Sequence, residues 1–254
     1  LSYLLPVHEI PEFKWKDNGT AIVNVIPIAK EDRIVSVVPV KDFDEPEKSF
    51  VFVTKRGQVK RTAIKEYETN RSTGIVAVKL AEGDEVVHVR MSDNTKELML
   101  ITKRGMSIRF REAEVGAMGR AASGVRGIHL REDDEVVAAE WVEGDEGEIL
   151  VVSDLGYVKR SLLLDYPVQG RGGKGIATFE FKEGKRIKPN GTRLLKAFYV
   201  KDAFRLTAVA ASGEQHSFST EDTPIEDRKS AGRPIVPLGK SDELVDVVRM
   251  DEVT

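Results

Sequence analysis

The chain has 254 residues, no cysteine and a formal net charge of −3. Without thiols it can form neither a disulfide framework nor a cysteine-based metal site. Its longest apolar runs, such as 98–101 and 149–152, have the length of strands and are too short to cross a bilayer. Its first residues show no signal-peptide pattern. We therefore expect a cytoplasmic protein with no membrane partner.

Short apolar runs bounded by Gly, Asp or Asn recur along the chain, which is typical of short strands joined by tight turns. One design recurs, in which a turn glycine separates an apolar strand from a strand with cations. Its copies are FVFVTKRGQVKR (50–61), LMLITKRGMSIR (98–109), ILVVSDLGYVKR (149–160) and the degenerate LTAVAASGEQHS (206–217). The turn glycines are 48, 51 and 57 residues apart. Glycine suits a two-strand turn that requires a positive φ.

Each copy is followed by a second signature, a glycine with apolar residues six and twelve positions later. Gly74, Gly124, Gly175 and Gly232 begin it, and residues 19–38 resemble it in a stretched form. A repeat of about 50 residues with four strands matches a propeller blade. We predict one repeat domain over 1–254, and a tandem β-sandwich is the alternative. Its parts are a partial blade (1–44) and four blades at about 45–94, 95–145, 146–201 and 202–254.

Charge is nearly balanced overall but segregates along the chain. Six cations between 55 and 71 accompany only Glu66 and Glu68, whereas every charged residue from 132 to 148 is acidic. The bulk charge argues mildly against a simple nucleic-acid binder. Segregation can nevertheless create a positive field on one surface of a protein with no net positive charge.

Several segments are similar to a known family. GRAASGVRGIHLREDDEVV (119–137) closely resembles the C-terminal domain of the A subunits of DNA gyrase and topoisomerase IV. QGRGGKG (169–175) resembles that family's gyrase box, Gln-Arg-Arg-Gly-Gly-Lys-Gly, and differs at Gly170. PVHEIPEFKWKDNG (6–19) and IKPNGTRLLKAFYV (187–200) look more like topoisomerase IV of Gram-positive bacteria than like gyrase.

The resemblance implies an all-β fold, a β-pinwheel or propeller-like disc of four-stranded blades that is closed, open or broken. It implies that double-stranded DNA is bound and bent on a basic outer rim and presented to a catalytic core for decatenation and relaxation. It places the strand-cleaving tyrosine, ATP and Mg²⁺ elsewhere, so we expect no cofactor in this domain. The implied partners are the ATPase B subunit and the rest of the A subunit, in an A2B2 complex associated with the bacterial nucleoid.

Two alternatives remain open. The box-like sequence lies in the fourth unit and has Gly170 in place of a basic residue, which puts gyrase-type wrapping in doubt. A gyrase A domain that wraps DNA for negative supercoiling is still an alternative. A propeller that serves as a protein–protein scaffold is another.

Phosphate binding along a curved path requires cations and backbone N–H donors and no base reading. We predict DNA contacts in the strands after the turn glycines, in the turns themselves, and in glycine-rich loops whose N–H groups can bind phosphate. The other interpretation is that these are ordinary solvated charges on turns and edges. The candidates are Lys60, Arg61, Arg109, Lys159 and Arg160 in the strands, Lys55, Arg56, Lys103 and Arg104 in the turns, and Arg71, Arg120, Arg126, Arg171 and Lys174 in the loops.

Catalytic and metal-binding patterns are weak. The four histidines are scattered without metal-ligand spacing. Residues 170–175 match G-x-G-x-x-G, but that motif requires a following helix, and here the strand-like IATFEF follows. We expect no catalytic residue and no metal site in this chain.

Overall fold

The computed structural model describes residues 1–29, 32–182, 184 and 186–250. Antiparallel strands dominate this part of the chain, and its helices are short 3-10 turns. No helix in these ranges is long and apolar enough to cross a membrane. The strands are β1 (Ser49–Thr54), β2 (Gln58–Ala63), β3 (Val86–Ser92), β4 (Glu97–Thr102), β5 (Met106–Arg111), β6 (Val125–Arg126), β7 (Val136–Val142), β8 (Glu148–Ser153), β9 (Tyr157–Leu162), β10 (Ile176–Ala177), β11 (Leu194–Val200), β12 (Arg205–Ala210), β13 (Gln215–Ser219), β14 (Arg233–Pro234) and β15 (Leu244–Met250).

The strands form four separate sheets, which we call blades. Blade 1 has the order β3-β1-β2-β6, blade 2 β7-β4-β5-β10, blade 3 β11-β8-β9-β14 and blade 4 β15-β12-β13. Each blade consists of a hairpin and a long inner strand from one repeat. In blades 1 to 3 a two-residue outer strand from the next repeat completes the sheet. Neighbouring blades therefore exchange strands.

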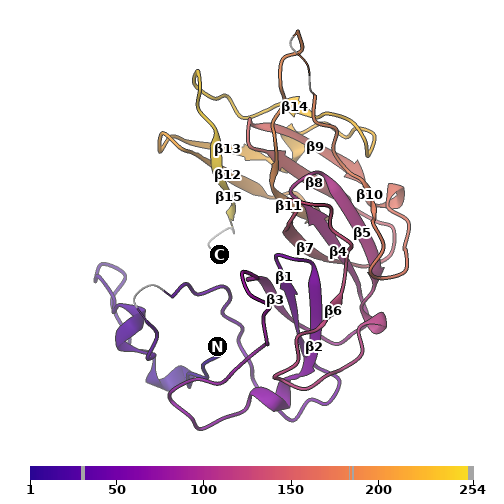
Figure 1. Ribbon diagram of the computed structural model, residues 1–254. Coiled ribbons are helices and arrows are strands. Elements are labelled where there is room, and N and C mark those ends of the chain that lie inside the picture. Colours follow the sequence, from indigo (N-terminus) through magenta and orange to yellow (C-terminus); the bar gives the residue numbers. More distant parts are fainter. Residues whose placement is uncertain (30–31, 183, 185, 251–254) are drawn as a thin grey trace.

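The blades stand side by side in an arc (Figure 1). The long strands β3, β7, β11 and β15 lie toward its centre, and the short strands β6, β10 and β14 lie at its outer edge. The arc does not close, since the N-terminal segment and blade 4 lie at its two ends. The predicted all-β pinwheel of four-stranded blades is confirmed in its open form.

The hydrophobic core lies between blades, not within them. In β4, Leu98 and Leu100 pack with residues of blade 1, while Met99 and Ile101 pack with residues of blade 3. Successive side chains of a strand point to opposite faces, so both faces of an inner blade are buried against neighbours. This is why the strands read as continuous apolar runs and not as alternating patterns.

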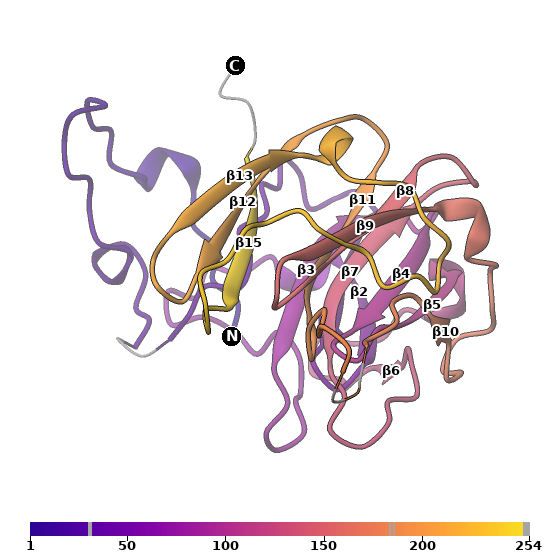
Figure 2. The same ribbon diagram turned by 90° about the horizontal axis from the view of Figure 1, so that it is seen from above.

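The second hairpin strand of each blade ends in a 3-10 turn: η3 (Ile64–Tyr67), η4 (Glu112–Glu114), η5 (Leu163–Asp165) and η6 (Thr220–Asp222). The N-terminal segment contains η1 (Val7–Glu9) and η2 (Ile22–Asn24) and meets blade 1 through an antiparallel bridge between Ser2 and Ile75. Seen from above, this segment lies at the margin opposite β10 (Figure 2).

Gly156 and Gly213 occupy the same hairpin turn in blades 3 and 4, with φ of +73° and +89°. A Cβ at Gly156 would lie 2.5 Å from the Val236 carbonyl oxygen of the following loop, while a Cβ at Gly213 would meet no described atom within 4 Å. We expect Gly156→Ala to lower the free energy of unfolding by more than the roughly 1–2 kcal/mol of left-handed strain. Gly213→Ala carries that strain alone and is the control. Equal losses in urea unfolding would contradict the interblade contact.

Candidate nucleic-acid interface

Four equivalent loops lead into the exchanged strands at the outer edge of the arc. We call residues 70–76, 120–126, 171–177 and 228–234 the rim loops. They carry one, two, two and three cations respectively, eight in all, and no Asp or Glu. The whole chain has more carboxylates than cations, 42 against 39, so the rim loops concentrate positive charge.

In three rim loops, an arginine lies four residues before the glycine at position 124, 175 or 232. The side chain of this arginine bonds to the preceding rim loop. Arg171 Nη1 donates to the Arg126 carbonyl oxygen at 2.6 Å. Arg120 Nη1 donates to the Val76 carbonyl in the same way, and Arg228 Nη1 to that of Ala177. One guanidinium N–H of each arginine is therefore used inside the protein.

Backbone hydrogen bonds continue this connection. The N–H of Lys79 donates to Ala122 O at 3.2 Å, that of His129 to Gly173 O at 2.8 Å, and that of Glu180 to Ser230 O at 3.3 Å. In each bond the donor lies five residues after the equivalent glycine of one rim loop (Gly74, Gly124 or Gly175). The acceptor carbonyl lies two residues before the corresponding glycine of the next rim loop. The four rim loops thus form one connected path over successive blades.

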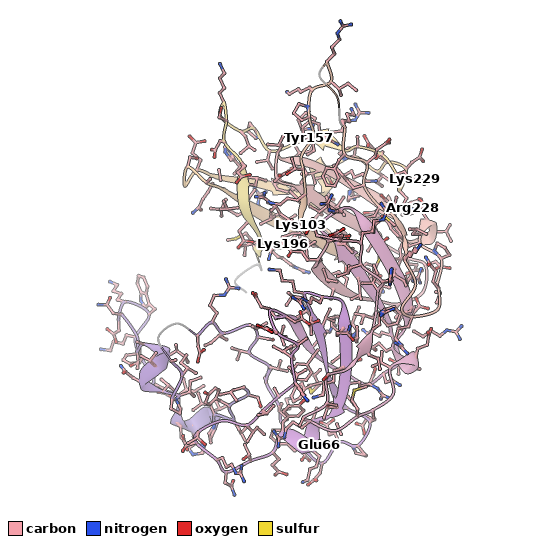
Figure 3. All side chains as sticks on the ribbon, in the orientation of Figure 1. Glu66, Lys103, Tyr157, Lys196, Arg228 and Lys229 are labelled. Carbon is pink, nitrogen blue, oxygen red and sulfur yellow. The ribbon has the colours of Figure 1, made fainter. Side chains whose placement is uncertain are left out.

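Other cations of the rim loops project outward. Arg71, Arg126, Lys174 and Lys229 are exposed. Figure 3 shows Arg228 and Lys229 near the outer edge of the arc, with Lys196 toward its centre. Arg120 and Arg171 are half-buried. The predicted loop residues thus lie on loops that hydrogen bonds join from one blade to the next.

The predicted strand contacts Lys60 and Lys159 lie inside the protein, with 1% and 0% exposure, so their assignment as DNA contacts is wrong. Lys60 Nζ donates to Ala77 O at 2.6 Å and also to the Arg120 carbonyl. Lys159 Nζ donates to the carbonyls of Asp227 and Arg228 at 2.7 and 2.6 Å. Each ammonium group thus donates hydrogen bonds to backbone carbonyls of the rim loop that covers it, or of the residue next to that loop.

Arg109 is also wrong as a DNA contact, since it is 2% exposed. Its Nε lies 2.8 Å from a Glu97 oxygen, and its Nη1 donates to Tyr166 O at 3.0 Å in the next blade. Arg61 and Arg160 hold equivalent places and are half-buried. Arg61 Nε donates to Val115 O at 2.7 Å, and Arg160 Nη2 to Thr223 O at 2.9 Å. We call Lys60, Arg61, Arg109, Lys159 and Arg160 the interblade cations.

The physical reason for these corrections is the packing of one blade on the next. In a single sheet the cationic face of β2, β5 or β9 would be solvated. Here the 3-10 turn and rim loop of the next repeat cover it, and their unpaired carbonyls accept the cations' hydrogen bonds. A buried charge is tolerated only with such partners.

The glycine-nest hypothesis for 171–174 is also partly wrong. The N–H of Arg171 donates to a Glu114 carboxylate oxygen at 2.9 Å. The N–H of Gly172 donates to Gly127 O at 2.7 Å. These two N–H groups are used within the protein and do not face a phosphate, so side chains supply the positive charge of this loop.

The predicted turn contacts divide into two kinds. Arg56 and Arg104 are exposed at their turns. Lys55 and Lys103 are half-buried, and their ammonium groups both lie 3.3 Å from the carboxylate of Glu135. One carboxylate thus offsets two neighbouring lysines, which weakens their attraction for phosphate.

The sequence interpretation missed three rim cations, Arg228, Lys229 and Arg233. The spacing of four residues from Arg120 to Gly124 and from Arg171 to Gly175 recurs from Arg228 to Gly232. That spacing is the signal that could have found Arg228, although it lies in the unit whose hairpin sequence is degenerate.

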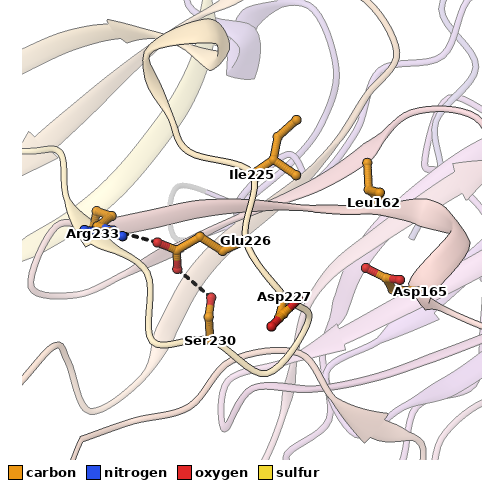
Figure 4. A pocket seen from close by; sticks show the side chains of 7 residues that line it. All are labelled: Leu162, Asp165, Ile225, Glu226, Asp227, Ser230 and Arg233. Atoms are coloured by element: carbon orange, nitrogen blue, oxygen red, sulfur yellow. Dashed lines mark hydrogen bonds and ion pairs between the residues drawn. The ribbon is translucent and has the colours of Figure 1, made fainter.

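A hollow of about 530 Å³ lies beside the last rim loop, between blades 3 and 4 (Figure 4). Its lining includes the carboxylates of Asp165, Glu226 and Asp227. Glu226 accepts hydrogen bonds from Ser230 at 2.6 Å and Arg233 at 2.7 Å. These carboxylates make the hollow unfavourable for an anion, in contrast to the cationic rim loop beside it.

Within the described ranges, no group of three or more His, Cys, Asp or Glu side chains is placed to hold a metal ion. The charged side chains of the rim loops are all cationic. The chemistry that this surface supports is anion binding.

The profile of a protein family described as "DNA gyrase C-terminal domain, beta-propeller" matches residues 2–41, 48–93, 96–140 and 147–187, more than half of the chain. The chain belongs to this family. The DNA gyrase A protein of Salmonella typhimurium is 33% identical over 250 residues, which are 98% of this chain and 28% of that protein. The gyrase A protein of Lawsonia intracellularis is 36% identical over 98% of this chain and 29% of that protein. This chain therefore spans under a third of these relatives.

Two solved structures of the gyrase and topoisomerase IV C-terminal domains have the same fold. The C-terminal domain of DNA topoisomerase IV superposes with a TM-score of 0.89 at 29% identity, over 97% of this chain and 75% of that one. The DNA gyrase A C-terminal domain superposes with a TM-score of 0.77 at 21% identity, over 98% of this chain and 78% of that one.

Arg109→Ala tests the interblade cations. The change leaves Glu97 and the carbonyls of the next blade without their partner, so we expect a loss of about 3–5 kcal/mol in the free energy of unfolding. Arg111→Ala, at the exposed end of the same strand, removes an equal charge and serves as the control, with an expected change below about 0.5 kcal/mol. Chemical denaturation measures both. Similar small losses would show that Arg109 does not hold the blades together.

Stability should rise with pH because of the buried lysines. Burial lowers the pKa of Lys159 to about 8 from 10.5, against the opposing effect of Glu226. Between pH 8 and 10.5 the unfolded chain binds more protons at this lysine than the folded chain, so the free energy of unfolding rises with pH in this range. Below pH 8 the lysine is charged in both states, and the folded protein bears the full cost of burying that charge. From pH 7 to 10 the native protein should gain about 2 kcal/mol relative to Lys159→Met. Parallel stability curves for the two proteins would contradict a buried ammonium.

Proposed function

We propose that this chain binds double-stranded DNA along the rim loops, as the C-terminal domain of a type II topoisomerase of the gyrase A and topoisomerase IV kind. The observation that carries the proposal is the connected path of rim loops, whose own residues include eight cations and no Asp or Glu over four consecutive repeats. Of the eight, Arg233 is paired with Glu226 of the neighbouring hollow. The relatives named as DNA gyrase A proteins support it.

The path suits a duplex because its charges recur with the blades. Each repeat places its rim cations in an equivalent loop, so a duplex that follows the outer edge would meet positive charge at intervals. Bending a duplex over 20–30 base pairs costs about 1–6 kcal/mol. Several phosphate contacts offset this cost, and they need no particular base sequence.

For the reaction, we propose topoisomerase IV, with the domain presenting a bent duplex for decatenation and relaxation. The sequence features at 6–19 and 187–200 and the glycine at position 170 favour it, as does the superposition with the topoisomerase IV domain. Gyrase-type wrapping is a second candidate, favoured by the identities of 33% and 36% to the two gyrase A proteins. In either case we propose that strand cleavage, ATP and Mg²⁺ belong to the rest of an A2B2 complex in the bacterial nucleoid.

The proposed DNA path can be tested by replacing one exposed cation in each of three consecutive rim loops: Arg126, Lys174 and Lys229. We expect their joint replacement by Gln to weaken duplex binding and to reduce the slope of log affinity against log salt by about 3, one unit per lost phosphate contact. Fluorescence anisotropy over a salt series measures both. The control replaces Lys96 and Lys201, which lie in the β3–β4 and β11–β12 connections, and Arg205, the first residue of β12, and should leave the slope unchanged. Equal effects of the two triple variants would contradict a rim path.

The two candidate reactions differ in DNA topology. On relaxed circular DNA treated with a nicking-closing enzyme, a topoisomerase IV domain that only bends the duplex should leave the linking number nearly unchanged. Chiral wrapping of the gyrase type would leave a distribution of shifted topoisomers, visible on an agarose gel. Such a shift would favour the gyrase candidate.

A further inference from the structure

Three equivalent places beside the rim loops differ in their chemistry. At each of them the segment that leads into a rim loop runs alongside the second hairpin strand of the preceding blade, through one parallel bridge. The bridges join Ala117 to Arg61, Val168 to Arg109 and Ile225 to Arg160. We call these places the first, second and third edge sites. The third edge site contains the hollow of Figure 4.

A carboxylate of the 3-10 turn has the same task at the first two edge sites. Glu66 Oε2 accepts the Arg120 N–H at 2.7 Å, and Glu114 Oε2 accepts the Arg171 N–H at 2.9 Å. Asp165 occupies the equivalent position at the third edge site, nine residues after the turn glycine. Its side chain is one methylene shorter, and no corresponding bond forms within the described ranges. The Asp165 carboxylate lines the hollow instead.

Two further carboxylates belong to the third edge site. Glu226 and Asp227 directly follow its bridge residue, where the second edge site has Gln169 and Gly170. Glu226 is bonded within the last rim loop, whereas the side chain of Asp227 is exposed and lines the hollow. The third edge site therefore attracts a cation more strongly than its two equivalents.

Aliphatic side chains are exposed at the same place. Leu162 and Ile225 line the hollow and are 43% and 50% exposed, and Leu164 on η5 is 65% exposed. The second edge site has Arg111 and Ala113 at the positions of Leu162 and Leu164. Single exposed apolar residues are common, but a group of them with a polar border is typical of a contact surface.

Neighbouring repeats leave the edge sites uncovered. Ala117 and Val168, the bridge residues of the first and second edge sites, are both exposed although further blades follow each of them. The lining of the third edge site comes from the third and fourth repeats, both of which form described blades. Its exposure is thus a property of this edge of the arc.

The lining restricts the class of ligand. Its carboxylates repel an anion such as DNA. Within the described ranges, no His, Cys, Asp or Glu side chains are grouped to hold a metal ion, and a bare cation would leave the aliphatic side chains in water. The volume of about 530 Å³ lies within the range of roughly 300–1,000 Å³ that is usual for sites of small ligands. A few side chains of a peptide fit such a volume.

We propose that the third edge site binds a short basic and apolar segment of a partner protein, in which a lysine or arginine lies beside a large aliphatic residue. The cationic group pairs with Asp165 and Asp227, and the aliphatic side chain covers Leu162 and Ile225. The methylene groups of lysine and arginine add to the apolar contact. Residues of the rim loop 228–234 also line the hollow, so the partner lies next to the proposed DNA path. Binding at this site requires no DNA.

Nuclear magnetic resonance titration tests the site directly. The probes are short synthetic peptides in which an arginine or lysine lies one, two or three positions from a leucine, added to isotope-labelled protein without DNA. We expect saturable amide shifts at residues 162–165 and 225–228. The equivalent residues 111–114 and 168–171 of the second edge site should show no comparable shifts, so they are a control within the same chain.

Two variants separate the charge from the apolar contact. Asp165→Asn combined with Asp227→Asn should raise the dissociation constant of the peptide about tenfold, through the loss of two surface ion pairs. Ile225→Ser should raise it at least about threefold, because apolar contact area is lost. Glu82→Gln combined with Glu132→Gln removes an equal charge from two exposed turns and should change the constant by less than about twofold, since distant surface charges are screened.

Three results would overturn the proposal. Equal binding of peptides with serine in place of leucine would mean attraction by charge alone. The same amide shifts with spermine at the same concentration would mean that the ligand is a small polycation. Absence of shifts at millimolar peptide would mean that the hollow binds no such segment. None of these results involves duplex binding, so the proposed function is tested separately.

Discussion

The exchange of a two-residue strand between neighbouring blades is the interaction on which the rest of the structure depends. β6, β10 and β14 each leave their own repeat to complete the preceding sheet. The rim loop before each short strand must therefore cross the outer edge of the arc. The glycine at its end allows the chain to approach the acceptor strand closely. The exchange thus produces both the curvature of the arc and the row of loops on its rim.

Burial of cations follows from the same exchange. A rim loop that crosses a hairpin strand has backbone carbonyls without a partner in a sheet. Lys60 and Lys159 donate hydrogen bonds to such carbonyls from the strand that the loop covers. Arg61, Arg109 and Arg160 do the same for the residues at and after the 3-10 turns. The repeat therefore contains two kinds of basic residue: one kind fixes adjacent blades to each other, and the other remains in solvent on the loops.

This division explains how a chain with a net charge of −3 can present a positive surface. Carboxylates collect at the 3-10 turns, at the turn of Glu135 and in the hollow beside Glu226. The rim loops contain none. Because a duplex is attracted by local charge and not by the total, the rim remains a suitable surface for DNA.

The sequence by itself determined the repeat, its hairpins and the turn glycines, because apolar periodicity and positive-φ turns are local properties of the chain. It did not determine which cations face solvent. Lys60 and Arg71 look alike in the sequence, yet one lies beneath a rim loop and the other on one. Only the tertiary structure decided this, because burial of a strand face depends on residues some fifty positions away. The exchange of strands was invisible for the same reason: a two-residue strand has no pattern of its own until another repeat provides its edge.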